Sequence, residues 1–401
     1  MRTPFIKPIH PFHEDEQTER ALQTLDFVEK SGGKRDRWAS LIVVSKMLDT
    51  IIHIYSLLSG SPTPILQFVS IRWKPHLNIA DVQQELALGE LRSVGTSLTR
   101  SSERLQLHHI KIHGLPKYFM FDGPSPLISN LTKLTFICTA NISFPSHLEL
   151  SAVLAASPRL EHLSLDMRAG NIAFSGFISE PTTIALLQVR LPLLRSFSLD
   201  TNDFYQWSLN LLQIVDAPGV EYLNINTDPA HGLSHSTPLE LYRYLANGRV
   251  NEVLQCHVSL DGITPGSSSI FPLLKHLSTE RMKQGPNTSA IFVAFPGVTH
   301  VTIGGAGASI LCNFLGYLPN VSHITYIHGD VLSALEASEC LRRRTIHKTI
   351  STLTWCINLP MHETSALLGF KDDRARHLGL EQYYHSPSEW GVDHLIIRQI
   401  E

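Results

Sequence analysis

Three histidines, His276, His300 and His323, occupy the same place in three copies of one short phrase. The phrase reads Pro-x-apolar-x-His-apolar-Ser/Thr, and successive copies are separated by 24 and 23 residues. Imidazole binds zinc and titrates close to neutral pH, so three aligned histidines have the chemistry of a metal site or a pH sensor. Either role requires a fold that brings the three copies side by side.

A looser form of this phrase, in which other residues can replace the histidine and the hydroxyl residue, occurs six times between residues 158 and 326, each time with a proline at one fixed offset. A seventh copy, Ser129–Phe136, lacks only the proline. The apolar residues at the centres of the seven copies are Leu134, Leu163, Phe197, Leu223, Leu277, Val301 and Ile324. Five of their separations lie between 23 and 34 residues, which is typical of a leucine-rich-repeat solenoid. The sixth, 54 residues, is close to two units and predicts a degenerate unit near residue 250.

The predicted fold class is α/β, a solenoid (horseshoe) with a parallel concave sheet and convex helices. Proline cannot continue a helix and favours an extended residue before it, so each proline marks the turn from helix to strand. Apolar spacing predicts strands at 65–73, 105–112, 350–357 and 392–400, besides the seven phrases. It predicts helices at 18–30, 37–58, 79–98, 148–156, 182–189, 209–215, 309–317, 331–343 and 363–378.

This pattern divides the chain into three parts. Residues 1–60 form an N-terminal tail and helical region, 61–357 form the solenoid, and 358–401 form a C-terminal cap. Terminal units of a solenoid are commonly atypical because they must cover an exposed end of the core.

Side chains alternate along a strand, so the phrases predict two columns on the face opposite the apolar residues. The first column is Lys133, His162, Ser196, Tyr222, His276, His300 and His323. The second is Thr135, Ser164, Ser198, Asn224, Ser278, Thr302 and Thr325, which we expect to face solvent. Strands lie about 4.8 Å apart, so the three histidines should form a ladder. No acidic partner repeats beside them, which disfavours a metal site.

Other motifs favour structural roles. Lys111 lies among His108, His109 and His113, and a cation opposes metal binding there. The glycine-rich segment 304–309 lacks the remaining residues of a dinucleotide or phosphate-binding loop. Hydrolase, zinc-protease and kinase motifs are missing from the sequence, so we expect a protein that is not an enzyme and has no cofactor.

Composition predicts a folded protein, because 43% of the residues are apolar and 17% are charged. The net charge of −3 and the dispersed Lys and Arg residues disfavour a nucleic-acid partner. The most apolar stretch, 41–58, carries Lys46, Asp49 and His53, which argues against a membrane span. Five cysteines without a Cys-x-x-Cys pair, and no signal peptide, predict a cytoplasmic and/or nuclear protein that is not secreted.

The phrases Ser157–Leu165 and Leu191–Leu199 resemble those of F-box and leucine-rich-repeat proteins of mushroom-forming (basidiomycete) fungi, over about residues 61–360. The resemblance implies that an N-terminal F-box binds a Skp1-type adaptor of a cullin-based ubiquitin ligase, while the repeats select a target. No Leu-Pro-x-Glu opening of an F-box precedes residue 60. The segment Leu41–Ile51 resembles the closing half of the F-box, so the resemblance implies adaptor contacts at Val44, Lys46, Leu48 and Ile51.

The leading functional prediction is therefore a non-enzymatic module for protein–protein interaction, and one form of it is a substrate receptor of a cullin-type ubiquitin ligase. Its expected binding residues are His162, Ser164, Ser196, Ser198, Tyr222, Asn224, His276, Ser278, His300, Thr302, His323 and Thr325. One alternative is a metal- or pH-dependent binding protein that uses the histidine column. Another is a decayed copy of the family that folds but has no partner.

Overall fold

A computed structural model describes residues 14–46, 50–51, 54, 65–73, 107–115, 129–138, 145–167, 187–201, 205–227, 241, 244–245, 270–279, 295–304, 318–328, 350–357 and 392–399. The chain divides into two compact units. The first is Met1–Leu194 with Asn210–Asp216, and the second is Arg195–Leu209 with Ala217–Glu401.

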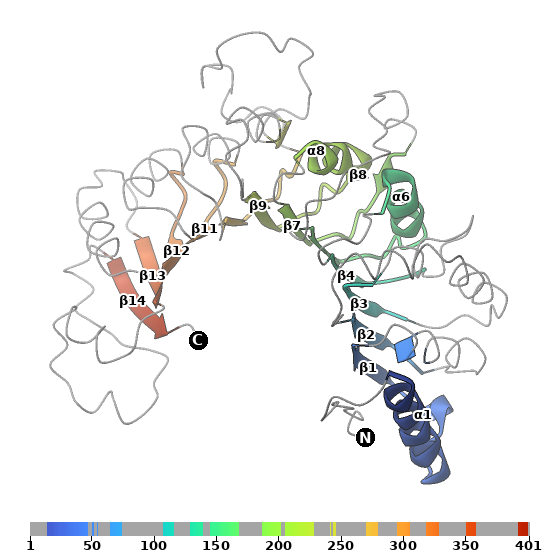
Figure 1. The fold of residues 1–401 in the computed structure, drawn as a ribbon. Coiled ribbons are helices and arrows are strands. Elements are labelled where there is room, and N and C mark those ends of the chain that lie inside the picture. The colour runs from blue at the N-terminus through green and yellow to red at the C-terminus, as the bar shows by residue number, and fades with distance from the viewer. Residues whose placement is uncertain are drawn as a thin grey trace, which may run out of the picture. The chain divides into compact units, whose positions relative to one another are not determined.

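Parallel strands in chain order build the sheet of the first unit (Figure 1). They are β1 (Ser40–Ser45), β2 (Phe68–Trp73), β3 (His109–His113), β4 (Lys133–Ile137) and β5 (His162–Asp166). The register places Val69 beside Ile110, then Leu134 and Leu163 on the following strands. All four side chains are buried, so one continuous apolar row joins the strands.

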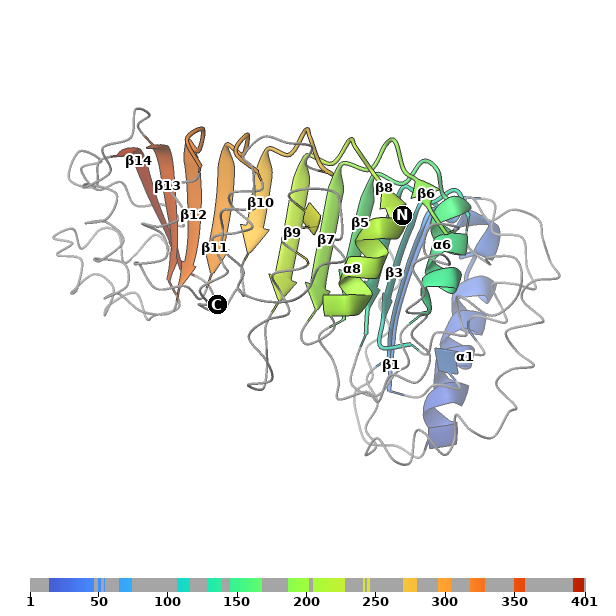
Figure 2. The same ribbon diagram turned by 90° about the horizontal axis from the view of Figure 1, so that it is seen from above.

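Parallel strands in chain order also build the sheet of the second unit (Figure 2). They are β7 (Ser196–Thr201), β9 (Tyr222–Thr227), β10 (His276–Thr279), β11 (His300–Gly304), β12 (His323–His328), β13 (Ile350–Ile357) and β14 (Val392–Gln399). A buried row again crosses the strands through Phe197, Leu223, Leu277, Val301 and Ile324. The protein is thus an α/β protein built on parallel strands.

Helices and short strands complete the described elements. They are α1 (Glu14–Lys30), the 3-10 helix η1 (Arg35–Arg37), α6 (His147–Ala155), α8 (Tyr205–Ile214), β6 (Val189–Arg190) and β8 (Val215–Asp216), and β6 pairs with β8 in parallel. A capping box starts α6: the amide of Glu149 donates to Ser146 Oγ at 3.2 Å, and the Ser146 amide donates to Glu149 Oε2 at 2.6 Å. Leu150, Val153 and Leu154 form the buried side of this helix.

Each proline of the repeated phrase lies in a β-turn that leads into a strand. The amide three residues after the start of the turn donates to the first carbonyl, as in Leu160 to Ser157 at 3.0 Å and Leu194 to Leu191 at 3.2 Å. Proline fits the second turn position because its fixed φ matches that position. Gly219 and Gly297, at the third position, do not have a positive φ, which agrees with type I turns.

Buried residues on both sides of the proline stabilise each of these turns. The residue before the proline and the residue two after it are both buried, as Leu191 and Leu194 are at 0% exposure. The turn therefore fixes two buried side chains directly before the strand that follows it. In the phrase without proline, Asn130 takes the third position with a φ of 59°, a conformation that asparagine tolerates. Its amide donates to the carbonyl of Ala156 at 2.8 Å, which anchors this turn to the end of α6.

The helix predicted over 37–58 is wrong at 40–45, where the chain forms β1. Leu41 and Val43 are buried while Ile42 and Val44 are half-buried, so burial alternates every second residue, as in a strand. The β-branched run Ile42-Val43-Val44 favours that conformation. The sheet consequently begins at Ser40, well before residue 61.

The degenerate unit predicted near residue 250 contributes no strand between β9 and β10. These two strands pair directly, with Leu223 beside Leu277 and Asn224 beside Ser278. The separation of 54 residues is therefore one long connection. Within it, residues 241 and 244–245 are helical, and Leu241 and Leu245 are buried.

Most of the other predicted elements that fall on described residues are confirmed. Strands lie within 65–73, 350–357 and 392–400, and β3 overlaps 105–112. The helices predicted at 18–30 and 148–156 correspond to α1 and α6, and the helix predicted at 209–215 lies in α8 except at Val215, which begins β8. The helix predicted at 182–189 is wrong at Val189, which begins β6. The helices predicted at 79–98, 309–317, 331–343 and 363–378 lie outside the described residues.

In the part of the chain that the structure describes, no helix is both long enough and apolar enough to cross a bilayer.

We predict that Phe197→Ala lowers the free energy of unfolding by about 3–5 kcal/mol, because it removes a fully buried ring from the row. Phe197 is 0% exposed, and its ring meets that of Phe271 edge-on at a centroid distance of 6.2 Å. Urea denaturation followed by circular dichroism measures the change. Leu273→Ala is the control, since Leu273 is 56% exposed in a prolyl turn and should change stability by less than about 0.5 kcal/mol. Equal effects of the two substitutions would contradict the buried row.

Candidate functional site

The register confirms the predicted columns within each unit. In the second unit, Ser196, Tyr222, His276, His300 and His323 are partners on successive strands. Ser198, Asn224, Ser278, Thr302 and Thr325 form the second column in the same way. In the first unit, Lys133 pairs with His162 and Thr135 pairs with Ser164.

His276, His300 and His323 form a stack, which we call the imidazole column. The ring centroids of His276 and His300 are 4.2 Å apart with an interplanar angle of 28°, and those of His300 and His323 are 4.1 Å apart at 11°. Tyr222 extends the stack, with its ring 6.3 Å from that of His276. The three imidazoles are half-buried and Tyr222 is 37% exposed, so one edge of the stack remains accessible.

The residues directly before the first-column residues form another regular row, which we call the hydroxyl row where they are serine or threonine. The hydroxyl of each such residue donates to the backbone carbonyl of the corresponding residue on the preceding strand. The bonds run from Thr132 to His108 (3.0 Å), Thr299 to Lys275 (3.4 Å), Ser322 to Thr299 (3.4 Å) and Ser351 to Ser322 (3.0 Å). This hydroxyl row links neighbouring strands at the point where each strand begins.

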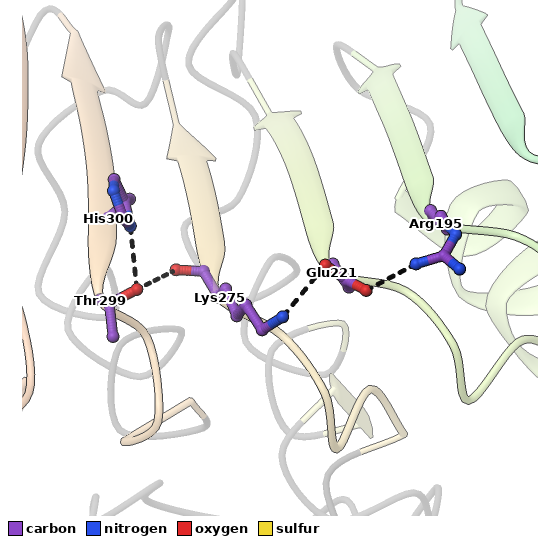
Figure 3. Close-up of polar contacts among 5 residues, drawn as sticks. All are labelled: Arg195, Glu221, Lys275, Thr299 and His300. Atoms are coloured by element: carbon purple, nitrogen blue, oxygen red, sulfur yellow. Dashed lines mark hydrogen bonds and ion pairs between the residues drawn. The ribbon is translucent and has the colours of Figure 1, made fainter.

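The same hydroxyls orient two imidazoles, and Figure 3 shows one of these contacts, between Thr299 and His300. Thr299 Oγ1 lies 2.9 Å from Nδ1 of His300, and Ser322 Oγ lies 2.8 Å from Nδ1 of His323. Each hydroxyl therefore contacts both the carbonyl of the preceding strand and Nδ1 of the imidazole that follows it. In either tautomer the hydroxyl occupies Nδ1, so Nε2 is the ring nitrogen at which these two imidazoles can meet another group.

Three charged residues replace the hydroxyls at this row on β7, β9 and β10. Arg195 Nη1 lies 2.8 Å from Glu221 Oε1, and Lys275 Nζ lies 3.2 Å from Glu221 Oε2 (Figure 3). The hydrogen bond and charge of Lys275, and then Arg195, lower the pKa of the Glu221 carboxyl, against a smaller effect of burial. One carboxylate thus serves two cations, and the cluster keeps a net positive charge.

Two imidazoles of the stack are hard to protonate. Burial, and then the charges of the neighbouring His276 and His323, lower the pKa of His300 to about 4. Burial is also the largest cause of the lowered pKa of His276, followed by the charge of Lys275, which Glu221 partly offsets. Both rings are consequently neutral at pH 7.

The geometry does not favour the metal site considered from the sequence. The lone pair of an imidazole lies in the ring plane, so rings stacked nearly parallel cannot point three nitrogens at one ion. Among the residues that the structure describes, no group of three or more His, Cys, Asp or Glu side chains is placed to hold a metal ion.

The second column is less exposed than predicted. Ser278 is 1% exposed, so the expectation of a solvent-facing column is wrong there, and the other members are half-buried. Asn224 Nδ2 donates to Ser198 Oγ at 2.9 Å across β7 and β9. Polar residues that the sequence analysis missed lie two positions further on: Asp200 and Asn226 are buried, with Asn226 Nδ2 at 3.5 Å from Asp200 Oδ2. Their shared offset from the phrase was the available signal.

The histidines of β3 and the one directly before it do not form a separate metal-binding site among the described residues. His109 is half-buried, with its ring 4.6 Å from that of Phe68. Burial, Lys133 and Lys111 lower its pKa, in that order. His108 is exposed and His113 is half-buried. Of the glycine-rich segment, Gly304 ends β11 and the remainder lies outside the described residues.

The expected adaptor-binding residues do not share an exposed helix face. Val44 is half-buried on β1, and the carbonyl of Lys46 accepts a bond from Trp73 Nε1 at 3.0 Å. Ile51 is 1% exposed, and Leu48 lies outside the described residues. No protein-family model and no curated protein matches the chain. Function is therefore inferred from the sheet face itself.

We predict that the protein loses stability as the pH falls from about 6.5 towards 4, in part because His300 must take up a proton on unfolding. The folded pKa lies below the unfolded one, so the unfolded chain binds more protons in this window. His300→Gln, which cannot titrate, should make the fall in melting temperature shallower. His162→Gln, an exposed histidine of β5, is the control and should keep the wild-type slope. Equal slopes for wild type and His300→Gln would contradict the assignment.

Proposed function

We propose that the chain is a non-enzymatic protein-binding module of the leucine-rich-repeat type, and that the first column of its second unit is the binding face. One observation carries the proposal: Tyr222, His276, His300 and His323 lie in register as a half-exposed stack on parallel strands. A stacked row across several strands forms a continuous surface, which suits a macromolecule better than a small substrate.

Repeated burial supports the choice of repeat type. Each prolyl phrase has buried residues before the proline, two residues after it and at the strand centre, as in Leu191, Leu194 and Phe197. A unit of this kind buries its apolar side only when it stacks on its neighbours. The parallel order of the strands in each unit agrees with such stacking.

The chemistry of the face supports protein binding. Tyrosine and arginine are enriched among residues that dominate binding energy at protein interfaces, and Tyr222 and Arg195 lie at the accessible edge of this surface. The hydroxyl row holds the imidazoles in place before a partner arrives, which reduces the entropy lost on binding.

The face is tested by comparing proteins recovered with three tagged full-length chains. In one variant, Tyr222, His276, His300 and His323 are all replaced by serine, the residue that Ser196 already places in this column. The control is Leu148→Ser, which changes a 58% exposed residue of α6. We expect a partner that wild type and control recover equally, and that binds the serine variant at least about tenfold more weakly when purified. Equal recovery and affinity of the partner with the serine variant and with wild type would contradict the proposed face. If no partner is recovered reproducibly, the result would favour a decayed family copy that folds but has no partner.

A ubiquitin-ligase role rests on the family resemblance and remains a prediction. Such a receptor would work in the cytoplasm or nucleus and bind a Skp1-type adaptor near residues 44–51. Titration of the full-length chain with a purified Skp1-type adaptor tests it, with Lys46→Glu as the variant, because Lys46 is half-buried and follows β1. Binding that Lys46→Glu weakens about tenfold would support the role. No binding would remove it and leave the sheet face as a protein-binding module.

A further inference from the structure

We propose that the imidazole column binds a carboxylate-rich protein segment and takes up a proton as it does so, which strengthens binding in mildly acidic solution. The inference rests on the proposed function and names the chemistry of its partner.

In His300 and His323, Nε2 is the ring nitrogen that can meet a partner, because Nδ1 already contacts Thr299 and Ser322. A protonated imidazole donates from Nε2 and carries a positive charge, so it binds a carboxylate more strongly than the neutral ring does. The ring centroids are 4.1–4.2 Å apart, which brings neighbouring imidazoles within reach of one carboxylate.

The surrounding charges favour an acidic partner. Beside the column, Arg195 and Lys275 are exposed cations and Glu221 is the carboxylate that both of them contact. On the other flank, β13 places the neutral Thr352 beside His323. Lys275, Glu221 and His323 act on the pKa of His276, and the two outer histidines act on that of His300. The sum of these described charges is positive, so a negatively charged segment is complementary to the face.

Protonation and binding are linked through the stack. A proton on one imidazole disfavours a proton on the next, because like charges repel at this distance. A carboxylate facing the rings stabilises the protonated form and raises its pKa in the complex. Between the pKa of the free protein and that of the complex, binding therefore takes up protons and becomes stronger as the pH falls. For one proton, affinity should rise about tenfold from about pH 7.5 to about pH 5.5.

The test uses a fluorescent peptide of about ten glutamates, which stay largely ionised over this pH range. Its affinity for the full-length protein is measured by fluorescence anisotropy at both pH values and constant ionic strength. A glutamine peptide of equal length shows whether charge is required. The protein variants are the triple substitution His276→Gln, His300→Gln and His323→Gln, and the control His108→Gln, which changes an exposed histidine directly before β3.

We expect the glutamate peptide to bind about tenfold more tightly at the lower pH to wild type and to His108→Gln, and the triple variant to lose this gain. NMR titration of the wild-type histidine ring signals keeps the test valid if the triple variant does not fold, because the peptide should raise three of the pKa values. Equal affinity at both pH values, an unchanged gain in the triple variant, unshifted ring signals, or equal binding of the glutamine peptide would overturn the proposal. If a natural partner needs the column but binds independently of pH, the proposed function stands and this inference fails.

Discussion

The in-register parallel pairing of one buried residue per strand is the constraint on which the rest of the structure depends. Leu134 lies beside Leu163 in the first unit, and Leu277 lies beside Val301 in the second. Each of these side chains is nearly inaccessible, so every strand loses apolar contacts if its neighbour shifts. A shift of one residue would also turn the apolar set towards the other face, which makes the register strongly specified.

This register by itself brings the residues of the candidate site together. Because the buried residues align, the residues before them align too, and three histidines from distant parts of the sequence come within stacking distance. The hydroxyls one position earlier align for the same reason, and each can reach the carbonyl of the preceding strand. On β9 and β10, where Glu221 and Lys275 occupy that position, ionic contacts join the strands instead. The chemistry of the face is therefore a by-product of how the core is packed.

The sequence predicted this alignment because the prolyl phrase carries both the turn and the strand in a few residues. It did not predict β1, because Leu41, Val44, Leu48 and Ile51 also fit helical spacing, and pairing with β2 decides between the two periods. Nor could spacing tell a missing repeat from a long connection before Leu277, since only the direct pairing of β9 with β10 distinguishes them. The burial of Ser278 and the low pKa of His300 depend on distances between side chains, which a linear pattern does not contain.

A polar sheet face does not require a row of histidines. Serine occupies the same column at Ser196, and threonine lies beside His323 at Thr352, so the sheet accepts smaller neutral side chains there. Burial, and then nearby groups that include the neighbouring histidines, lower the pKa of His276 and of His300, which favours the neutral state of these two rings in the free protein. The orientation of two rings by Thr299 and Ser322 further fixes which nitrogen meets solvent. Neutral stacking in the free protein and a latent capacity for charge are thus two consequences of the same spacing between strands.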